Sequence, residues 1–353
     1  MTSINLTARL GLNATLLRDR ISTLGEQIST GRKGNTYSTI GTDSPKAMDL
    51  RAEIGRRDIY EKTIDQTLGK IRVSQDVLDR IGAVAQKFLA NSAKLLGASR
   101  PEEIQVQAGQ AEAAMIEVAS LLNEQFSGEY LFGGSDSRNP PIPKPLDIMK
   151  SGMGLDIKNE VGNLNATNVA AVTAATKALA QSDVTGTTPF SAFLSTGIGK
   201  TEPRVSILGG DDNRVSYGIH ANRNAAVVST GETTGSWARD LLRGLASIAG
   251  LTPQKGQLGD SYVNFVTTVR KGLESSVDAL ALERGSLGVT EDRLQEIVAH
   301  HESVSTTLKL QLSDLEEVDM AETITAFQTT QTQLEASYRA IGVAQQLSLT
   351  RFL

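Results

Sequence analysis

The sequence predicts a mainly α-helical protein. Both chain ends are expected to form a long antiparallel helical bundle or coiled coil, with an inserted α+β or β-rich middle domain. Three observations carry this prediction: heptad-spaced apolar residues near both ends, prolines gathered in the centre, and an aromatic content of only 4%. Ala, Leu, Ile, Val and Thr therefore supply most of the buried surface, which is typical of long helices packed side by side.

The first predicted helix lies near the N-terminus. Its apolar residues recur at alternating steps of four and three, which is the spacing of a heptad seam. They are Leu10, Ala14, Leu17, Ile21, Leu24 and Ile28. A basic turn, residues 31–34 (GRKG), closes this helix at the end where cations favour the helix dipole.

Two early prolines mark the starts of further helices, because proline is accepted in a first turn but breaks a helix interior. Pro45 follows three good capping residues, 42–44, and Pro101 lies in a capping-box pattern at 99–102. The periodic apolar residues of these helices are Ile64, Leu68, Ile71, Leu78, Ile81 and Phe88, and then Ile104, Ala108, Ala111, Met115, Val118 and Leu122.

The middle of the chain differs in composition and holds seven of the nine prolines. Residues 133–160 are rich in Gly, Pro, Ser and Asp, which predicts loops or a hairpin. Alternating residues at 205–207 and 215–219 flank the turn-forming segment 209–213, which predicts a β-hairpin. One short amphipathic helix is expected over 237–248.

Long helices return beyond the middle. One stripe comprises Leu273, Val277, Leu280, Leu287, Leu294, Ile297, Val304, Leu308 and Leu315. Gly285 and Gly288 are expected to weaken or kink this helix, at about 1 kcal/mol each relative to Ala. The acidic pair 316–317 is expected to be solvated on the helix surface. The last helix is predicted to place its apolar residues on one stripe: Ile324, Phe327, Leu334, Tyr338 and Ile341.

These patterns predict three parts of the chain. Residues 1–40 and 314–353 form a discontinuous terminal helical assembly domain, residues 41–135 and 255–313 a discontinuous helical rod domain, and residues 136–254 an inserted β-containing domain. Two terminal helices bury little surface by themselves. The chain is therefore either a closed long bundle, or a subunit whose ends order only when another copy covers their apolar stripes.

Composition excludes several classes of function. A net charge of −5 without a dense Lys/Arg cluster argues against nucleic-acid binding. Zero cysteines exclude disulfides, thiolate metal sites and a cysteine nucleophile. No apolar run approaches the ~20 residues of a membrane span, and residues 1–12 lack the pattern of a cleaved signal peptide. We expect neither a nucleic-acid nor a membrane partner.

Motifs for catalysis or metal binding are incomplete. Adjacent His300 and His301 point about 100° apart on a helix, so they do not form the i, i+4 pair of a metal site. The HExxH-like start at His301 has Ser305 in place of its second histidine, and residues 194–201 lack the first glycine of a P-loop. Residues 209–213 suit a hairpin turn better than a calcium loop. We expect no catalytic, cofactor-binding or metal site, and no enzymatic activity.

Several segments resemble the bacterial flagellin superfamily. Residues 24–33 (LGEQISTGRK) are similar to its LSxG+ opening, and residues 43–47 (DSPKA) to the DDPxxA element that follows. The spacer 35–42 is longer than the usual one. Residues 283–288 (ERGSLG) resemble the RAxLG segment, and residues 313–322 (SDLEEVDMAE) resemble the SxIEDxDMAE element, which is the most specific match. The likeness covers both helical ends and barely touches the middle.

Three further features resemble the branch of this superfamily that joins the flagellar hook to the filament. Pro45 stands where the main filament flagellins typically read DDAAG. Residues 333–338 (QLEASY) and 347–353 (LSLTRFL) are similar to the LQASY…LSLxxxL ending of that branch. Residues 128–134 (GEYLFGG) resemble its GxYLFGG hairpin entry.

The resemblance implies a structural subunit of the bacterial flagellum, joining hook to filament and secreted to the cell exterior without a cleaved signal peptide. The implied partners are neighbouring copies, flagellin, the other hook-associated protein, and the flagellar export chaperone and export apparatus. Terminal helices would pair with those of neighbours in a helical tube. The implied contact residues are Leu10, Leu17, Ile21, Leu24, Ile28, Ile324, Phe327, Leu334, Tyr338 and Ile341.

Three alternatives remain open from the sequence. The contact residues would pack only within the chain if the bundle is closed. The chain would be a filament-forming flagellin if the purified protein polymerises alone into long filaments. It would be an enzyme if the insert, residues 136–254, shows activity in a screen, as in flagellins that carry protease domains.

Overall fold

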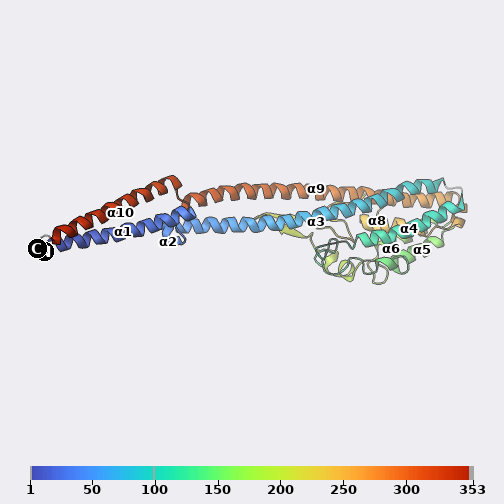
Figure 1. The fold of residues 1–353 in the computed structure, drawn as a ribbon. Helices are drawn as coiled ribbons and strands as arrows, with labels where there is room; N and C mark the ends of the chain where they lie inside the picture. The colour runs from blue at the N-terminus through green and yellow to red at the C-terminus, as the bar shows by residue number, and fades with distance from the viewer. Residues whose placement is uncertain (1, 98–99, 350–353) are drawn as a thin grey trace. The chain divides into compact units, whose positions relative to one another are not determined.

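The computed structural model (Figure 1) describes residues 2–97 and 100–349, and within them the side chains of 8–36, 38–97 and 100–343. Helices account for most of this part of the chain, and the strands are short. The predicted mainly α-helical fold with an inserted middle region is therefore confirmed.

The described chain divides into two units. Unit 1 comprises Met1–Ile59 and Ala299–Leu353, and unit 2 comprises Tyr60–Val298. Two long helices, α3 (Ser44–Leu96) and α9 (Asp260–Glu316), contribute residues to both units. The three domain boundaries expected from the sequence stay predictions.

Unit 1 is built around the helix pair α1 (Thr2–Thr30) and α10 (Met320–Leu349), which lie side by side and antiparallel (Figure 1). The short helices α2 (Tyr37–Ile40) and η1 (Gly41–Asp43) follow α1. Helix α1 ends at Thr30, and the next residue, Gly31, has a φ of 70°, the left-handed conformation that glycine adopts without strain.

Unit 2 combines parts of α3 and α9 with shorter elements. Its helices are α4 (Pro101–Leu121), η2 (Pro145–Asp147), α5 (Gly152–Gly162), α6 (Val169–Gln181), α7 (Ala192–Ser195), η3 (Ile198–Lys200), α8 (Trp237–Ala249) and η4 (Pro253–Leu258). Its strands form two antiparallel pairs, β1 (Gln125–Phe126) with β2 (Glu129–Tyr130), and β3 (Ser206–Leu208) with β4 (Arg214–Ser216). The predicted hairpin at 205–219 is thus confirmed.

Helix α8 lies at the centre of unit 2. It packs against α4, α5 and α6, and all of its residues are buried. The predicted amphipathic helix is confirmed in position, but its polar face is buried as well. Arg239 donates to the carbonyl oxygens of Asn222 at 2.9 Å and Ala180 at 2.8 Å, and Arg243 donates to Glu232 at 2.8 Å. Because these charges are paired, their burial is tolerated.

The predicted helix starts are confirmed in part. Pro45 is the second residue of α3 and Pro101 the first of α4, as the rule for proline in a first turn predicts. The N-cap of α4 is Arg100, which makes no side-chain capping bond. The capping serine that the sequence suggested, Ser99, lies outside the described residues.

One expectation about the helices stays a prediction and another is wrong. Gly285 and Gly288 lie within α9, which continues from Asp260 to Glu316 without ending at either glycine, so their expected weakening of the helix stays a prediction. The segment 133–160 is not loop throughout, because α5 begins at Gly152.

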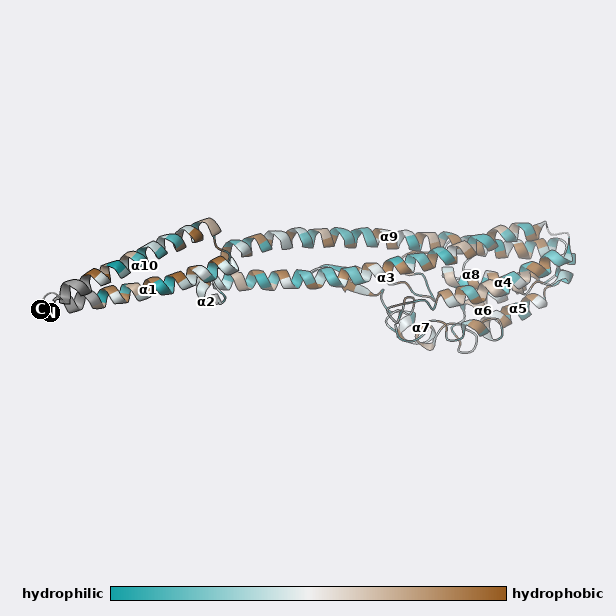
Figure 2. Cartoon of the chain, in the orientation of Figure 1, coloured by the Kyte–Doolittle hydropathy of each residue, from teal (hydrophilic) through white to brown (hydrophobic). Residues whose placement is uncertain are grey.

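The middle region fits the α+β alternative rather than the β-rich one, since its described part contains α5 to α8 and a single short strand pair. None of the described helices is long and apolar enough to cross a bilayer. Along α3 and α9, apolar and polar residues alternate (Figure 2).

Candidate functional site

The histidines do not form a chemical site. Within residues 2–97 and 100–349, no group of three His, Asp or Glu side chains could hold a metal ion. His301 is buried, with Nδ1 3.0 Å from Nη1 of Arg57, whereas the adjacent His300 is exposed. His220 is fully buried, and burial together with Arg223 lowers its pKa to about 4, so the ring is neutral at pH 7.

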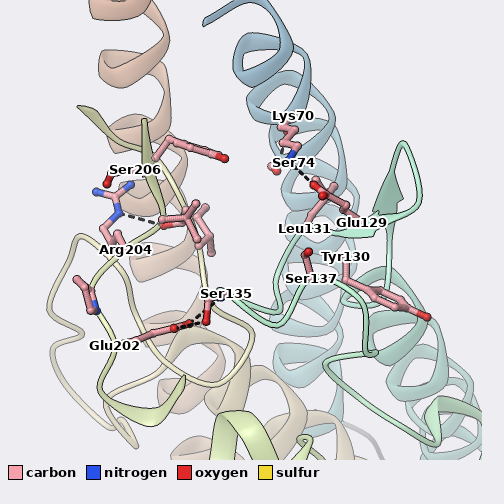
Figure 3. Close-up of a pocket in the computed structure, with 16 residues that line it drawn as sticks. Lys70, Ser74, Glu129, Tyr130, Leu131, Ser135, Ser137, Glu202, Arg204 and Ser206 are labelled. Atoms are coloured by element: carbon pink, nitrogen blue, oxygen red, sulfur yellow. Dashed lines mark hydrogen bonds and ion pairs between the residues drawn. The ribbon is translucent and has the colours of Figure 1, made fainter. Parts of the chain in front are cut away.

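A cavity of about 380 Å³ in unit 2 is lined by polar side chains (Figure 3). On one side, Lys70 of α3 pairs with Glu129 of β2. On the other side, Nε of Arg204 donates to the carbonyl oxygen of Gly218 at 3.0 Å. Figure 3 shows these two groups on opposite walls, with the cavity between them.

Glu202, which is buried, also lines this cavity. Its Oε1 accepts from the amide of Ser135 at 2.9 Å, and its Oε2 accepts from the Ser135 hydroxyl at 2.6 Å. Burial by itself raises the pKa of Glu202, but the two Ser135 hydrogen bonds and His220 hold it below its ordinary value. Lys70 and Glu129 are therefore paired within the chain and Glu202 is held by Ser135, whereas Nη2 of Arg204 is buried without a hydrogen-bond partner. We assign these groups to the packing of unit 2.

The helix pair α1–α10 of unit 1 offers a different kind of site. Its inner seam alternates small buried residues with larger, half-buried ones. On α10, Thr323 and Thr330 are 7% and 3% exposed, and Phe327 and Leu334 lie half-buried beside them; on α1, Ala14 is 5% exposed. The α10 residues follow each other at steps of four and three, so the inner seam has heptad spacing.

Most of the sequence-predicted contact residues belong to the inner seam. A Cβ on Gly25 of α1 would lie 3.8 Å from Cε2 of Phe327, which shows how closely the two helices approach. The predicted residues that are half-buried on this helix pair are Leu10, Leu17, Ile21, Leu24, Ile28, Phe327, Leu334 and Ile341.

Two predicted contact residues are more exposed than the other eight. Ile324 and Tyr338 are 40% and 48% exposed. Each follows a more buried residue, Thr323 or Ser337, by one position, which turns the side chain by about 100° around the helix. At 100° per residue the five apolar residues of α10 fall within an arc of about 100°, so the single stripe stays a prediction, with Ile324 and Tyr338 at its more exposed edge.

Large apolar side chains also point outward from the same helix pair. Leu12 and Leu16 of α1 are 66% and 60% exposed, and Val343 of α10 is 56% exposed. With Ile324 and Tyr338, they form what we call the outer set. Covering such side chains with a partner gains roughly 25 cal/mol per Å² of apolar area, so the outer set marks a surface that favours association.

Threonine hydroxyls of α10 are bonded within their own helix. The hydroxyl of Thr325 donates to the carbonyl oxygen of Ala321, and that of Thr329 to the carbonyl oxygen of Thr325, each at 2.8 Å. These three residues also line a shallow hollow of about 520 Å³ beside Arg20 of α1. A hydroxyl that already donates a hydrogen bond within its own helix has a smaller free-energy penalty when it is buried. This surface is therefore suited to contact with another protein.

A set of contacts joins the segment that follows α1 to the segment between α9 and α10. We call it the clasp and define it as residues 31–33 and 314–318. Arg32 and Glu317 form an isolated antiparallel β-bridge. The amide of Val318 donates to Gly31 O at 3.0 Å, and the amide of Lys33 donates to Glu316 O at 2.8 Å. The clasp therefore brings together two of the flagellin-like segments that lie almost at opposite ends of the sequence.

Charged side chains strengthen the clasp. Nζ of Lys33 donates to the carbonyl oxygens of Asp314 at 3.1 Å and Leu315 at 2.8 Å, where a cation favours the C-terminus of α9. The carboxylate of Glu316, only 5% exposed, accepts from Nη2 of Arg51 at 2.7 Å and from Nη2 of Arg32 at 3.4 Å. The expectation that Glu316 is solvated is therefore wrong, while its neighbour Glu317 is exposed.

Sequence reasoning missed three residues of this site. Thr323 and Thr330 were passed over because the stripe was traced through apolar residues only, although their spacing of seven is a usable signal. Glu316 offered no such signal, because its partner Arg51 is distant in sequence and only the fold brings the two together.

Comparison with known families identifies the C-terminal part of this site. Residues 271–353 match a family described as the bacterial flagellin C-terminal helical region. The matched residues include the α9 side of the clasp and the described part of α10. The chain has no match among curated proteins. Through its C-terminal region, the chain is thus similar to bacterial flagellins.

Proposed function

We propose that this protein is a structural subunit of the bacterial flagellum and assembles through the helix pair α1–α10. The observation that carries the proposal is the outer set, which leaves large apolar side chains of both terminal helices exposed in a single chain. The flagellin match over residues 271–353 supports the same function. A structural rather than an enzymatic role agrees with that family.

Within the flagellum, we place the protein at the junction of hook and filament, as hook-associated protein 3. Pro45, at the start of α3, and the QLEASY segment, 333–338 in α10, support this position by their resemblance to the junction branch. So does the GEYLFGG segment, 128–134, which contains β2. The similar ending at 347–353 reaches residues 350–353, which lie outside the described residues.

The inner seam and the outer set have different roles in this proposal. The inner seam holds α1 against α10 within one subunit. The outer set contacts the terminal helices of neighbouring copies, and repetition of the same contact between unlike surfaces builds an open-ended helical tube. The ten predicted contact residues are then divided: Ile324 and Tyr338 act between subunits, and the eight seam residues support them from within.

The proposed partners follow from the junction position. Neighbouring copies, flagellin and the other hook-associated protein contact the assembled subunit, and the flagellar export chaperone and export apparatus handle it before assembly. The proposed location is outside the cell, reached without a cleaved signal peptide.

Gold-conjugated antibody on intact flagella, viewed by electron microscopy, tests the position. A single narrow band between hook and filament is expected. Label along the whole filament would instead identify the chain as a filament flagellin, and absence of label from flagella would contradict a flagellar function altogether.

Polymerisation of the purified protein separates the two flagellar alternatives. The match to the flagellin C-terminal helical region is compatible with both. We expect the purified chain to form short oligomers rather than long filaments. Long filaments formed by this chain alone would favour the flagellin alternative.

A further inference from the structure

The inner seam of the helix pair does not by itself determine how α1 and α10 are aligned. On α10, Thr323 and Thr330 are separated by seven residues, and so are Phe327 and Leu334. A slip of one heptad along the partner helix would move the chain by about 10 Å and replace each seam residue with a similar one. Apolar contacts therefore favour several alignments almost equally.

The clasp, in contrast, can close in one alignment only. Its backbone bonds join particular partners, such as Val318 to Gly31 and Lys33 to Glu316. A slip of seven residues would separate all of them. Polar groups with a single set of partners are the usual means by which helix pairs specify their register.

Glu316 is the centre of the clasp. Its carboxylate lies at the end of α9 and is 6% exposed. It pairs with Arg32, which follows α1, and with Arg51, which belongs to α3. One buried side chain thus joins three segments, and a buried charge that loses its partners is strongly unfavourable.

We propose that the buried carboxylate of Glu316, paired with the more exposed Arg32 and Arg51, sets the register of α1 against α10, with Glu316 as the positioning residue. This inference rests on the proposed function of the helix pair as the assembly surface. The outer set combines residues of both helices, such as Leu12 of α1 and Tyr338 of α10, so its shape depends on their alignment. Glu316 thereby determines the surface that a second copy meets, without being part of it.

Cysteine cross-linking in the full chain tests the register directly, because the chain has no cysteine of its own. Gly25→Cys with Phe327→Cys reports the native register, since a Cβ at position 25 would lie 3.8 Å from Cε2 of Phe327. Gly25→Cys with Leu334→Cys, or with Met320→Cys, reports a slip of one heptad in either direction. The thiol cross-linker must be shorter than the ~10 Å rise of one heptad.

We expect Glu316→Gln to lower the native cross-link about tenfold and to produce a slipped one, because it removes the charge that both arginines bind. Glu317→Gln is the matched control, since Glu317 is the neighbouring carboxylate and is exposed. It should cross-link as the unchanged chain does. The charge exchange Arg51→Glu with Glu316→Arg should restore most of the native cross-link.

Trp237, the single tryptophan, reports whether unit 2 remains folded in each variant. If Glu316→Gln retains the native cross-link at the level of Glu317→Gln, the proposal is wrong. Loss of both the native and the slipped cross-links, with unchanged tryptophan emission, also overturns it, because Glu316 would then hold the helices together instead of aligning them.

Assembly is measured separately, on chains that carry the substitutions at Glu316 or Glu317 but not the added cysteines. A chain that keeps the native register but does not assemble contradicts the proposed function and leaves the role of Glu316 intact. A Glu316→Gln chain that slips but assembles normally contradicts the link between register and assembly surface.

Discussion

Nη2 of Arg51 donates to the buried carboxylate of Glu316 across 2.7 Å, although 265 positions separate the two residues in the chain. The contact lies where the helix pair α1–α10 meets the ends of α3 and α9 within unit 1. Glu316 also accepts from Arg32, which directly follows the C-cap of α1. One carboxylate thereby joins the segments that carry the proposed assembly surface.

Leu17→Asp should abolish assembly and leave the β3–β4 hairpin of unit 2 folded. The change places a charge on the inner seam, where an unpaired carboxylate costs several kcal/mol to bury. Polymer formation is measured by sedimentation, and folding of unit 2 by the emission of Trp237. Leu17→Met, which keeps the apolar volume, is the control. Assembly that survives Leu17→Asp would show that Leu17 does not lie on the seam.

Tyr338→Ser and Leu334→Ser should separate the roles of the outer set and the inner seam on α10. Tyr338 belongs to the outer set, so its loss should weaken assembly while the native cross-link between positions 25 and 327 persists. Leu334 belongs to the inner seam, so its loss should lower both the cross-link and assembly. Equal effects of the two changes on the cross-link would contradict the division into an outer set and an inner seam.

Unfolding of unit 2 should depend on pH through His220. Its pKa is about 4 in the folded chain and about 6.5 when unfolded. Between these values the unfolded state binds a proton that the folded state does not, so stability falls as the pH is lowered. From pH 7.5 to pH 5 the loss from this group is about 2 kcal/mol.

Urea unfolding at the two pH values, followed by Trp237 emission, measures this loss. Burial raises the pKa of Asp240, which gives a contribution of opposite sign, so the difference between the unchanged chain and His220→Gln isolates the histidine. His300→Gln, at an exposed histidine of unit 1, is the control for replacing a histidine elsewhere in the chain. A His220→Gln chain with undiminished pH dependence would show that another group is responsible.

Replacing two helical glycines with alanine should change the free energy of unfolding in opposite directions. At Gly244 in α8, a Cβ would lie 2.4 Å from Cδ2 of Leu273, so Gly244→Ala should destabilise unit 2 by about 1–3 kcal/mol. At Gly285 in α9, a Cβ would meet no atom within 4 Å, so Gly285→Ala should stabilise the chain by about 0.5–1 kcal/mol. Urea unfolding curves measure both changes. A stabilising Gly244→Ala would contradict the packing of α8 against α9.

The long helices could be predicted because their signals are local. Heptad-spaced apolar residues and prolines in the first turn depend only on the sequence near each helix, and they located α1, α3, α4, α9 and α10. The sequence pattern predicts no helix at α6, whose many alanines give little contrast between an apolar and a polar face, and it predicts loops where α5 lies, because that segment is rich in Gly, Pro, Ser and Asp. Packing against α8 stabilises α5 despite its glycines.

By itself, the sequence determined the helical class, the central insertion and the stripes of the terminal helices, since each is a periodic property of nearby residues. The tertiary structure decided which residues of a stripe are buried. It placed Thr323 and Thr330 on the seam and left Ile324 and Tyr338 exposed, because burial depends on the position of the partner helix. The tertiary structure also determined that Glu316 is buried, because the fold brings Arg32 and Arg51 to its carboxylate.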